Sequence, residues 1–156
     1  MSGIRMAGIE DIKAIHLLGI ELLESSDYNG IKGDEKKFKL LVANLITHKH
    51  GQVYVVADES NEPQGFFIGM IDEYFFSQYR FATDIAVYVR EGYRQHAAAL
   101  YNKFIKWAKT KPKVVRISFA QSSGMGDHAR WCRLMEHLGL TCVGSMYTMR
   151  VTPCQA

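Results

Sequence analysis

The sequence predicts an α/β protein (α+β, with a mixed sheet), in which a central twisted sheet is flanked by about four helices. Apolar residues recur at helical spacing in several segments, and apolar or aromatic runs typical of strands lie between them. The order also contains a strand-helix-strand unit, which adds a parallel pair to an antiparallel sheet. With 47% apolar and 22% charged residues, the chain has the balance of one folded domain, spanning 1–156.

The N-terminal part predicts one short strand and two helices. The strand is expected at Ile4–Met6, and a helix follows from Ile9 because its apolar residues repeat at helical spacing. A polar stretch ending in Gly30 interrupts this pattern and predicts a loop. The side chain of Asp34 can cap a second amphipathic helix, which we expect to end near residue 47.

The middle of the chain predicts an antiparallel meander. Gln52–Asp58, Gly65–Phe76 and Phe81–Val89 are rich in β-branched and aromatic residues, and short polar turns separate them. A helix is expected to follow immediately, with apolar residues from Ala97 to Ala108 on its inner face. The remaining elements are a strand at Val114–Ala120, a helix capped by Asp127 and stopped by Gly139, and two last strands near Leu140–Val143 and Ser145–Val151.

Composition argues against several classes of protein. The formal net charge is +3 and the basic residues are scattered, so we expect no nucleic-acid partner. No run approaches the roughly 20 apolar residues of a membrane span, and no signal peptide is apparent. The three Cys form no CxxC pair, which favours reduced thiols in a soluble, cytoplasmic protein. His48 and His50 have no further ligands nearby, so no metal site is predicted.

The most informative segment is the junction DIAVYVREGYRQHAAA, from Asp84 to Ala99. An apolar strand runs there through a polar turn into a helix. Such a junction gathers free backbone N–H groups and the positive end of a helix, a combination that binds phosphate. Arg94 adds a full positive charge beside it. The alternative interpretation is a plain strand-to-helix turn without a ligand.

The string YVREGYRQHAAALYNKFIKWAK resembles motif A of the GNAT acetyltransferases, a strand and short turn followed by Arg/Gln-x-x-Gly-x-Gly/Ala at the start of a helix. The matching positions are Arg94, Ala97 and Ala99. The C-terminal RLMEHLGLTCVGSMYTMRV is similar to the helix end and last two strands of that family, and the element order resembles it over nearly the whole chain. The stretch FATDIAVYVREGYR also resembles small GNAT proteins encoded in phage genomes.

This resemblance implies a GNAT-like acyl-CoA N-acyltransferase fold that uses acetyl-CoA and no metal. The pyrophosphate would lie at the motif-A turn, and the pantetheine would pair along the preceding strand where two central strands splay apart. An amine attacks the thioester directly, a strand N–H holds the oxyanion, and a strand carboxylate accepts the amine proton. The implied cofactor-binding residues are Val87, Tyr88, Val89, Arg94, Gln95, His96, Ala97, Ala98 and Ala99.

Asp84 is the candidate base. It lies in an otherwise apolar strand, and a period of two places it on the face of Ala86 and Tyr88. A carboxylate in such a strand is costly unless it is paired or used. Its spacing from Arg94 resembles that of the family's strand carboxylate. The alternative is a strand-end Asp that faces solvent or forms an ion pair.

The motif departs from the family in two places. Ala97 replaces the first glycine and Gln95 stands where Gly is common, although glycine allows the closest backbone approach to phosphate. The Tyr that commonly protonates the leaving thiolate is replaced by Met135, which cannot donate a proton. Tyr147, on a predicted late strand, is the candidate substitute acid, and the alternative is an ordinary half-buried Tyr.

These observations predict an acetyl-CoA-dependent N-acetyltransferase, whose partners are acyl-CoA and an amine acceptor that the sequence does not identify. The alternative is a catalytically degenerate GNAT-fold protein, acting as a CoA-binding, interaction or structural subunit in a host cytoplasm or a phage virion. The departures at Ala97 and Met135 favour that alternative. An aromatic block is expected to form a substrate wall, a self-association surface for a homo-oligomer, or core: Tyr74, Phe75, Phe76, Tyr79 and Phe81.

Overall fold

The computed structural model describes residues 3–122 and 124–151. The chain divides into two units, Met1–Met125 and Gly126–Ala156, so the expectation of a single domain stays a prediction. The second unit contains α4 (His128–His137). The elements of the first unit are, in chain order, β1 (Gly3–Met6), the 3-10 helix η1 (Ile9–Asp11), α1 (Ile12–Glu24), α2 (Glu35–Thr47), β2 (Gly51–Ala57), β3 (Pro63–Glu73), β4 (Arg80–Val89), the 3-10 helix η2 (Glu91–His96), α3 (Ala97–Lys109) and β5 (Val114–Ser118).

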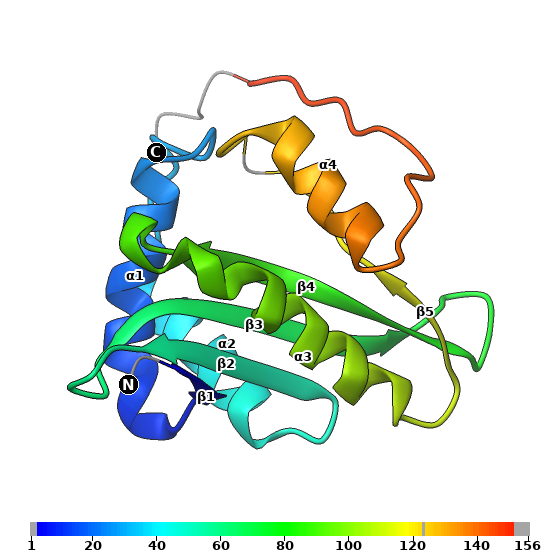
Figure 1. Cartoon of the computed structure of the whole chain (residues 1–156), viewed down its shortest axis with the longest axis horizontal. Coiled ribbons are helices and arrows are strands. Elements are labelled where there is room, and N and C mark those ends of the chain that lie inside the picture. Colours follow the sequence, from blue (N-terminus) through cyan, green and yellow to red (C-terminus); the bar gives the residue numbers. More distant parts are fainter. Residues whose placement is uncertain (1–2, 123, 152–156) are drawn as a thin grey trace. The chain divides into compact units, whose positions relative to one another are not determined.

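The first unit is built on a five-stranded sheet of order β1-β2-β3-β4-β5 (Figure 1). The first four strands pair antiparallel, and β4 pairs parallel with β5. The predicted meander and the predicted mixed sheet are therefore both confirmed. The parallel pair arises because α3 carries the chain back along the sheet before β5 begins.

Helices cover both faces of this sheet. On one face, α1 and α2 pack against alternate side chains of β2 and β3, and the core residues of this cluster include Ile15, Leu18, Val42, Val53, Val55, Phe66 and Ile68. On the other face lies α3, where the ring of Phe67 stands 4.8 Å from Phe104 and 5.4 Å from Tyr101 between centroids. Period-two alternation along β3 thus supplies both layers of the core.

The predicted helix boundaries follow from single residues. The side chain of Asp34 accepts a hydrogen bond from the backbone N–H of Lys37 at 2.9 Å, and caps α2. In the second unit, Asp127 accepts from the backbone N–H of Arg130 at 3.1 Å and caps α4. Gly139 follows α4 with φ of 88°, the left-handed conformation expected for a glycine stop.

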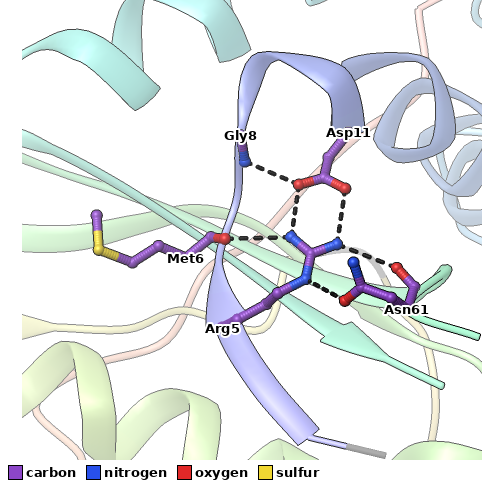
Figure 2. A network of polar contacts seen from close by, with 5 residues as sticks. All are labelled: Arg5, Met6, Gly8, Asp11 and Asn61. Atoms are coloured by element: carbon purple, nitrogen blue, oxygen red, sulfur yellow. Dashed lines mark hydrogen bonds and ion pairs between the residues drawn. The ribbon is translucent and has the colours of Figure 1, made fainter. Parts of the chain in front are cut away.

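A partly buried ion pair links β1 to η1 (Figure 2). The guanidinium of Arg5 donates to both carboxylate oxygens of Asp11, at 2.7 and 2.9 Å, and the backbone N–H of Gly8 donates to the same carboxylate at 2.8 Å. Arg5 also donates to the side chain and carbonyl of Asn61 in the turn between β2 and β3. The hydrogen bonds from Arg5 lower the pKa of Asp11 below its usual range, more than burial raises it.

The two strands predicted near Leu140–Val143 and Ser145–Val151 are wrong. Residues 140–151 are irregular, and Val143, Tyr147 and Met149 are exposed. Their β-branched and aromatic residues have strand propensity, but propensity makes a strand only where a ladder satisfies the backbone groups. Among the described residues the sheet ends at β5, so this stretch has no such ladder.

Candidate active site

The pairing between β4 and β5 covers only the first part of β4. The register runs from Arg80 opposite Val114 to Thr83 opposite Ser118, and no described residue continues it. From Asp84 to Val89, β4 is paired with β3 alone. β5 ends at Ser118, so among the described residues the second half of β4 has no strand partner on this side, at the place where the sequence resemblance implies an opening between two strands. The outer backbone groups of Val87–Val89 face this opening.

A β-bulge interrupts β4 at the same place. The register with β3 passes from Ala86 opposite Ile68 to Asp84 opposite Gly69, which leaves Ile85 as an extra residue. Directly opposed residues share a face. Ala86 packs into the core under α1 and α2, whereas a Cβ on Gly69 would meet the α3 ring of Phe104. The bulge thus moves Asp84 to the α3 face, and the period-two expectation for Asp84 is corrected.

Asp84 lies in an environment that disfavours its charge. The residue is largely shielded, and burial raises the pKa of its carboxyl to about 6. Backbone hydrogen bonds from Asp84 itself and from Ala120, just beyond β5, oppose this rise only in part. The carboxylate therefore sits at the fork between the two strands with a pKa suited to accepting a proton near neutral pH.

The head of α3 differs from the open turn that the sequence predicted. A 3-10 helix, η2, occupies Glu91–His96 and runs directly into α3. The backbone N–H of Ala97 donates to the carbonyl of Arg94, so this group already has a partner. Such 3-10 turns are frequent at the N-termini of α-helices. With Gln95 and Ala97 in place of glycines, the backbone takes ordinary helical angles here.

Solved structures of acetyltransferases match the chain over nearly its full length. Glucosamine-6-phosphate N-acetyltransferase from Arabidopsis thaliana is 13% identical, with a TM-score of 0.73 and 97% of this chain and 99% of that chain covered. AAC(6')-Iy, in complex with a CoA-containing bisubstrate analogue, is 13% identical, with a TM-score of 0.70 and coverage of 98% and 99%. Ribosomal-protein-alanine N-acetyltransferase from Brucella melitensis biovar Abortus 2308 is 14% identical, with a TM-score of 0.66 and coverage of 96% and 99%.

The chain has the GNAT acetyltransferase fold. No protein-family model and no curated protein sequence matches it. At these identities the likeness shows the fold alone, and the roles of individual residues rest on the geometry described above. Within residues 3–122 and 124–151, no group of His, Cys, Asp or Glu is placed to hold a metal ion, and no helix is long and apolar enough to cross a membrane.

A polar network that the sequence did not reveal anchors the separated half of β4 in this GNAT fold. Glu21 on α1 accepts hydrogen bonds from the hydroxyl of Tyr88 at 3.1 Å and from two nitrogens of Arg90, one of them at 3.1 Å. Arg90 also donates to the side chain of Gln64 at 2.8 Å. The bonds from Arg90 lower the pKa of Glu21. Glu21 lies three residues after the buried Leu18, on the same face of α1. A charged residue on an otherwise apolar helix face was the sign in the sequence that Glu21 has a polar partner.

The predicted cofactor-binding residues lie in two neighbouring places. Val87–Val89 form the end of β4, and Arg94 to Ala99 span η2 and the first turn of α3. Burial and Glu21 raise the pKa of the Tyr88 hydroxyl, and the charges of Arg90 and Arg94 oppose this rise. The Nε2 atom of His96 is buried and has no hydrogen-bond partner among the described residues.

The loop after β5 contacts the loop after α1. The hydroxyl of Tyr28 donates to the hydroxyl of Ser122 at 3.1 Å, and the hydroxyl of Ser25 lies 3.7 Å from the sulfur of Met125. These contacts join the segment between α1 and α2 to the loop after β5. The resemblance implies that Ser122 and Ser123, which follow this strand, contact CoA or substrate, and Ser123 lies outside the described residues.

The second unit contains Met135 and Tyr147, the two residues that the sequence analysis considered for protonation of the leaving thiolate. Met135 is buried on α4, as expected for an apolar side chain that fills space. Tyr147 is 93% exposed in the irregular segment, instead of half-buried on a strand. Its role as a proton donor stays a prediction.

Proposed function

We propose that this protein is an acetyl-CoA-dependent N-acetyltransferase, which transfers an acetyl group to an amine by direct attack in a ternary complex. The observation that carries the proposal is the unpaired half of β4, which ends at the head of α3. An extended ligand with alternating amide groups can pair along such an edge. The GNAT fold supports the same conclusion, and one structural neighbour was solved with a CoA-containing analogue.

Each part of the opening has a role in this proposal. The backbone of Val87–Val89 offers the hydrogen-bonding groups for pantetheine amides. Arg94 is an exposed cation next to that edge and supplies charge for the pyrophosphate. Glu21, through Tyr88 and Arg90, holds the strand end in position without contacting the reacting atoms.

Asp84 acts as the base. Bound acetyl-CoA supplies an activated thioester, and the chemistry requires the amine to lose a proton as its nitrogen forms the new bond to the acetyl carbon. With a pKa of about 6, Asp84 is ionised at neutral pH and accepts that proton. The carbon–sulfur bond breaks, and solvent protonates the leaving thiolate.

One observation favours the alternative of a degenerate GNAT-fold protein. The N–H of Ala97 is bonded to the carbonyl of Arg94, so it is not free to bind pyrophosphate in this conformation. The departure of the sequence at Met135 from the family's Tyr favours the same alternative, because Met cannot donate a proton. The two functions differ in a measurable way, because a degenerate protein binds CoA without turnover, binds it weakly or does not bind it at all.

Calorimetric titration with acetyl-CoA, followed by thiol release with a panel of amines, tests the proposal. We expect binding and release with the wild-type chain. Arg94→Ala should weaken binding by about 10- to 100-fold, because one charge-assisted contact is lost. Lys109→Ala, at the far end of α3, is the matched control and should bind normally. Binding without release supports a degenerate CoA-binding protein, and no binding at millimolar acetyl-CoA excludes the enzyme and leaves the interaction or structural subunit.

A further inference from the structure

The turn between β3 and β4 carries aromatic side chains that the proposed reaction does not use. Phe75 is 99% exposed, Phe76 71% and Tyr79 57%. Isolated exposed apolar residues are ordinary, but neighbouring large rings on one turn mark an interaction surface. We call residues 74–79 the aromatic turn.

Hydrogen bonds and ring contacts hold the aromatic turn in one conformation. The backbone N–H of Tyr74 donates to the carbonyl of Tyr79 at 3.1 Å, and the backbone N–H of Tyr79 donates to the hydroxyl of Ser77 at 3.1 Å. The ring of Phe76 stands 5.1 Å from both Tyr74 and Phe75 between centroids. Because these hydrogen bonds already hold the backbone of the turn, a partner that covers it loses little backbone entropy.

The exposed area of these rings fits a small protein interface. An aromatic side chain buries about 150–250 Å² when covered, so the exposed fractions of the three rings offer roughly 340–570 Å² per copy. A standard interface buries about 800 Å² per partner, and a specific one exceeds about 1,000 Å² in total. Two aromatic turns packed together therefore supply most of such an interface, and the flanking strand ends supply the remainder.

The charges beside the rings identify the partner. Asp72 and Glu73 end β3 on one side of the turn, and Arg80 begins β4 on the other, bonded to Glu73 at 2.9 Å. The carboxylates beside the rings repel an anionic membrane surface or a nucleic acid, which argues against both as partners. A second copy brings the same charges, and because Arg80 and Glu73 already neutralise each other within the chain, a two-fold contact between the rings meets little net charge repulsion.

We propose that the aromatic turn is the contact surface through which two copies of this chain form a two-fold dimer. The surface lies at the start of β4, whereas the proposed acetyl-CoA edge, Val87–Val89, lies at its end. The dimer does not depend on the proposed function, and either proposal can fail while the other holds.

Sedimentation velocity of the full chain from about 1 to 100 µM tests the proposal. We expect a monomer–dimer equilibrium for wild type. The double variant Phe75→Ser/Phe76→Ser should raise the dissociation constant about 100-fold or more, because central aromatic anchors dominate small interfaces. Leu40→Ser, which removes an exposed apolar side chain from α2, is the matched control and should dimerise like wild type.

Thermal melts and acetyl-CoA titration of the same samples show whether the double variant is still folded and still binds its ligand. Because Phe75 and Phe76 are exposed, the double variant should melt and bind like the monomeric wild-type chain. A wild-type chain that remains monomeric throughout the range overturns the proposal, even if it binds anionic vesicles or single-stranded DNA. A dimer that survives the double variant, or that Leu40→Ser weakens equally, also overturns it.

Discussion

Replacing Asp84 by Asn should stabilise the protein and slow its proposed reaction, and both effects have the same cause. Burial raises the pKa of Asp84 to about 6, from 3.8 for an unperturbed carboxyl. An acid whose pKa rises on folding is favoured in its protonated form. Its contribution to stability is therefore full below pH 4, and is lost as pH rises from about 4 through 6. The gap between these pKa values corresponds to roughly 3 kcal/mol of destabilisation at pH 8.

Asn keeps the shape of the side chain but cannot ionise. The free energy of unfolding of Asp84→Asn should exceed that of wild type by up to about 3 kcal/mol at pH 8, and the difference should vanish near pH 4. Urea denaturation at several pH values measures this difference. Asp72→Asn, an exposed carboxylate on the neighbouring strand, is the matched control and should change the unfolding free energy by less than about 0.5 kcal/mol.

The same variant tests the proposed base. Wild-type acetyl transfer should rise with pH through about 6 and then level off, whereas Asp84→Asn should be slower by about 100- to 10,000-fold with little change in acetyl-CoA affinity. If Asp84→Asn destabilises the protein at pH 8, the argument from burial is wrong. If it transfers acetyl at the wild-type rate, Asp84 is not the base.

Two further predictions concern the fold. Asp11→Asn should lower the unfolding free energy by about 1–3 kcal/mol at pH 7, because it weakens a partly buried ion pair with Arg5. Since the pKa of Asp11 is lowered in the fold, the wild-type contribution is present above about pH 4 and is lost as pH falls, so urea titrations of the variant at several pH values should show a flatter acid limb. Gly69→Ala should cost about 1–3 kcal/mol in the same assay, because its Cβ would lie 2.5 Å from the ring of Phe104, whereas Gly92→Ala, with open space around its Cβ, should be neutral. Equal stabilities for the two alanine variants would contradict the close packing of α3.

Local signals were sufficient to predict most of the fold. Asp34 and Asp127 cap the helices that they were expected to cap, and Gly139 takes the left-handed conformation. These predictions succeeded because a cap depends on residues within one turn of the chain. The strands predicted after residue 139 failed for the converse reason, since a strand depends on a neighbour that the sequence cannot specify.

The candidate site was only partly predictable for the same reason. The opening between β4 and β5 agrees with the resemblance, but the extra residue at Ile85 was hidden, because the run DIAVYV alternates like an ordinary strand. Glu21 and Arg90 are 69 residues apart in sequence, so only the folded chain brings them together. The local pattern shows the charge of Glu21 beside a buried helix face, but it does not identify Arg90 as its partner.

The unpaired half of β4 also bears on how this protein behaves at high concentration. Backbone groups without a strand neighbour are a template for a foreign strand, and natural sheets protect such edges with irregularities and charge. The extra residue at Ile85 and the guanidinium of Arg90 stand at the two ends of this stretch. The backbone between these two ends still offers unpaired groups to a strand from another molecule. A ligand that occupies this edge should therefore slow aggregation, and purified protein without the ligand should aggregate sooner on storage.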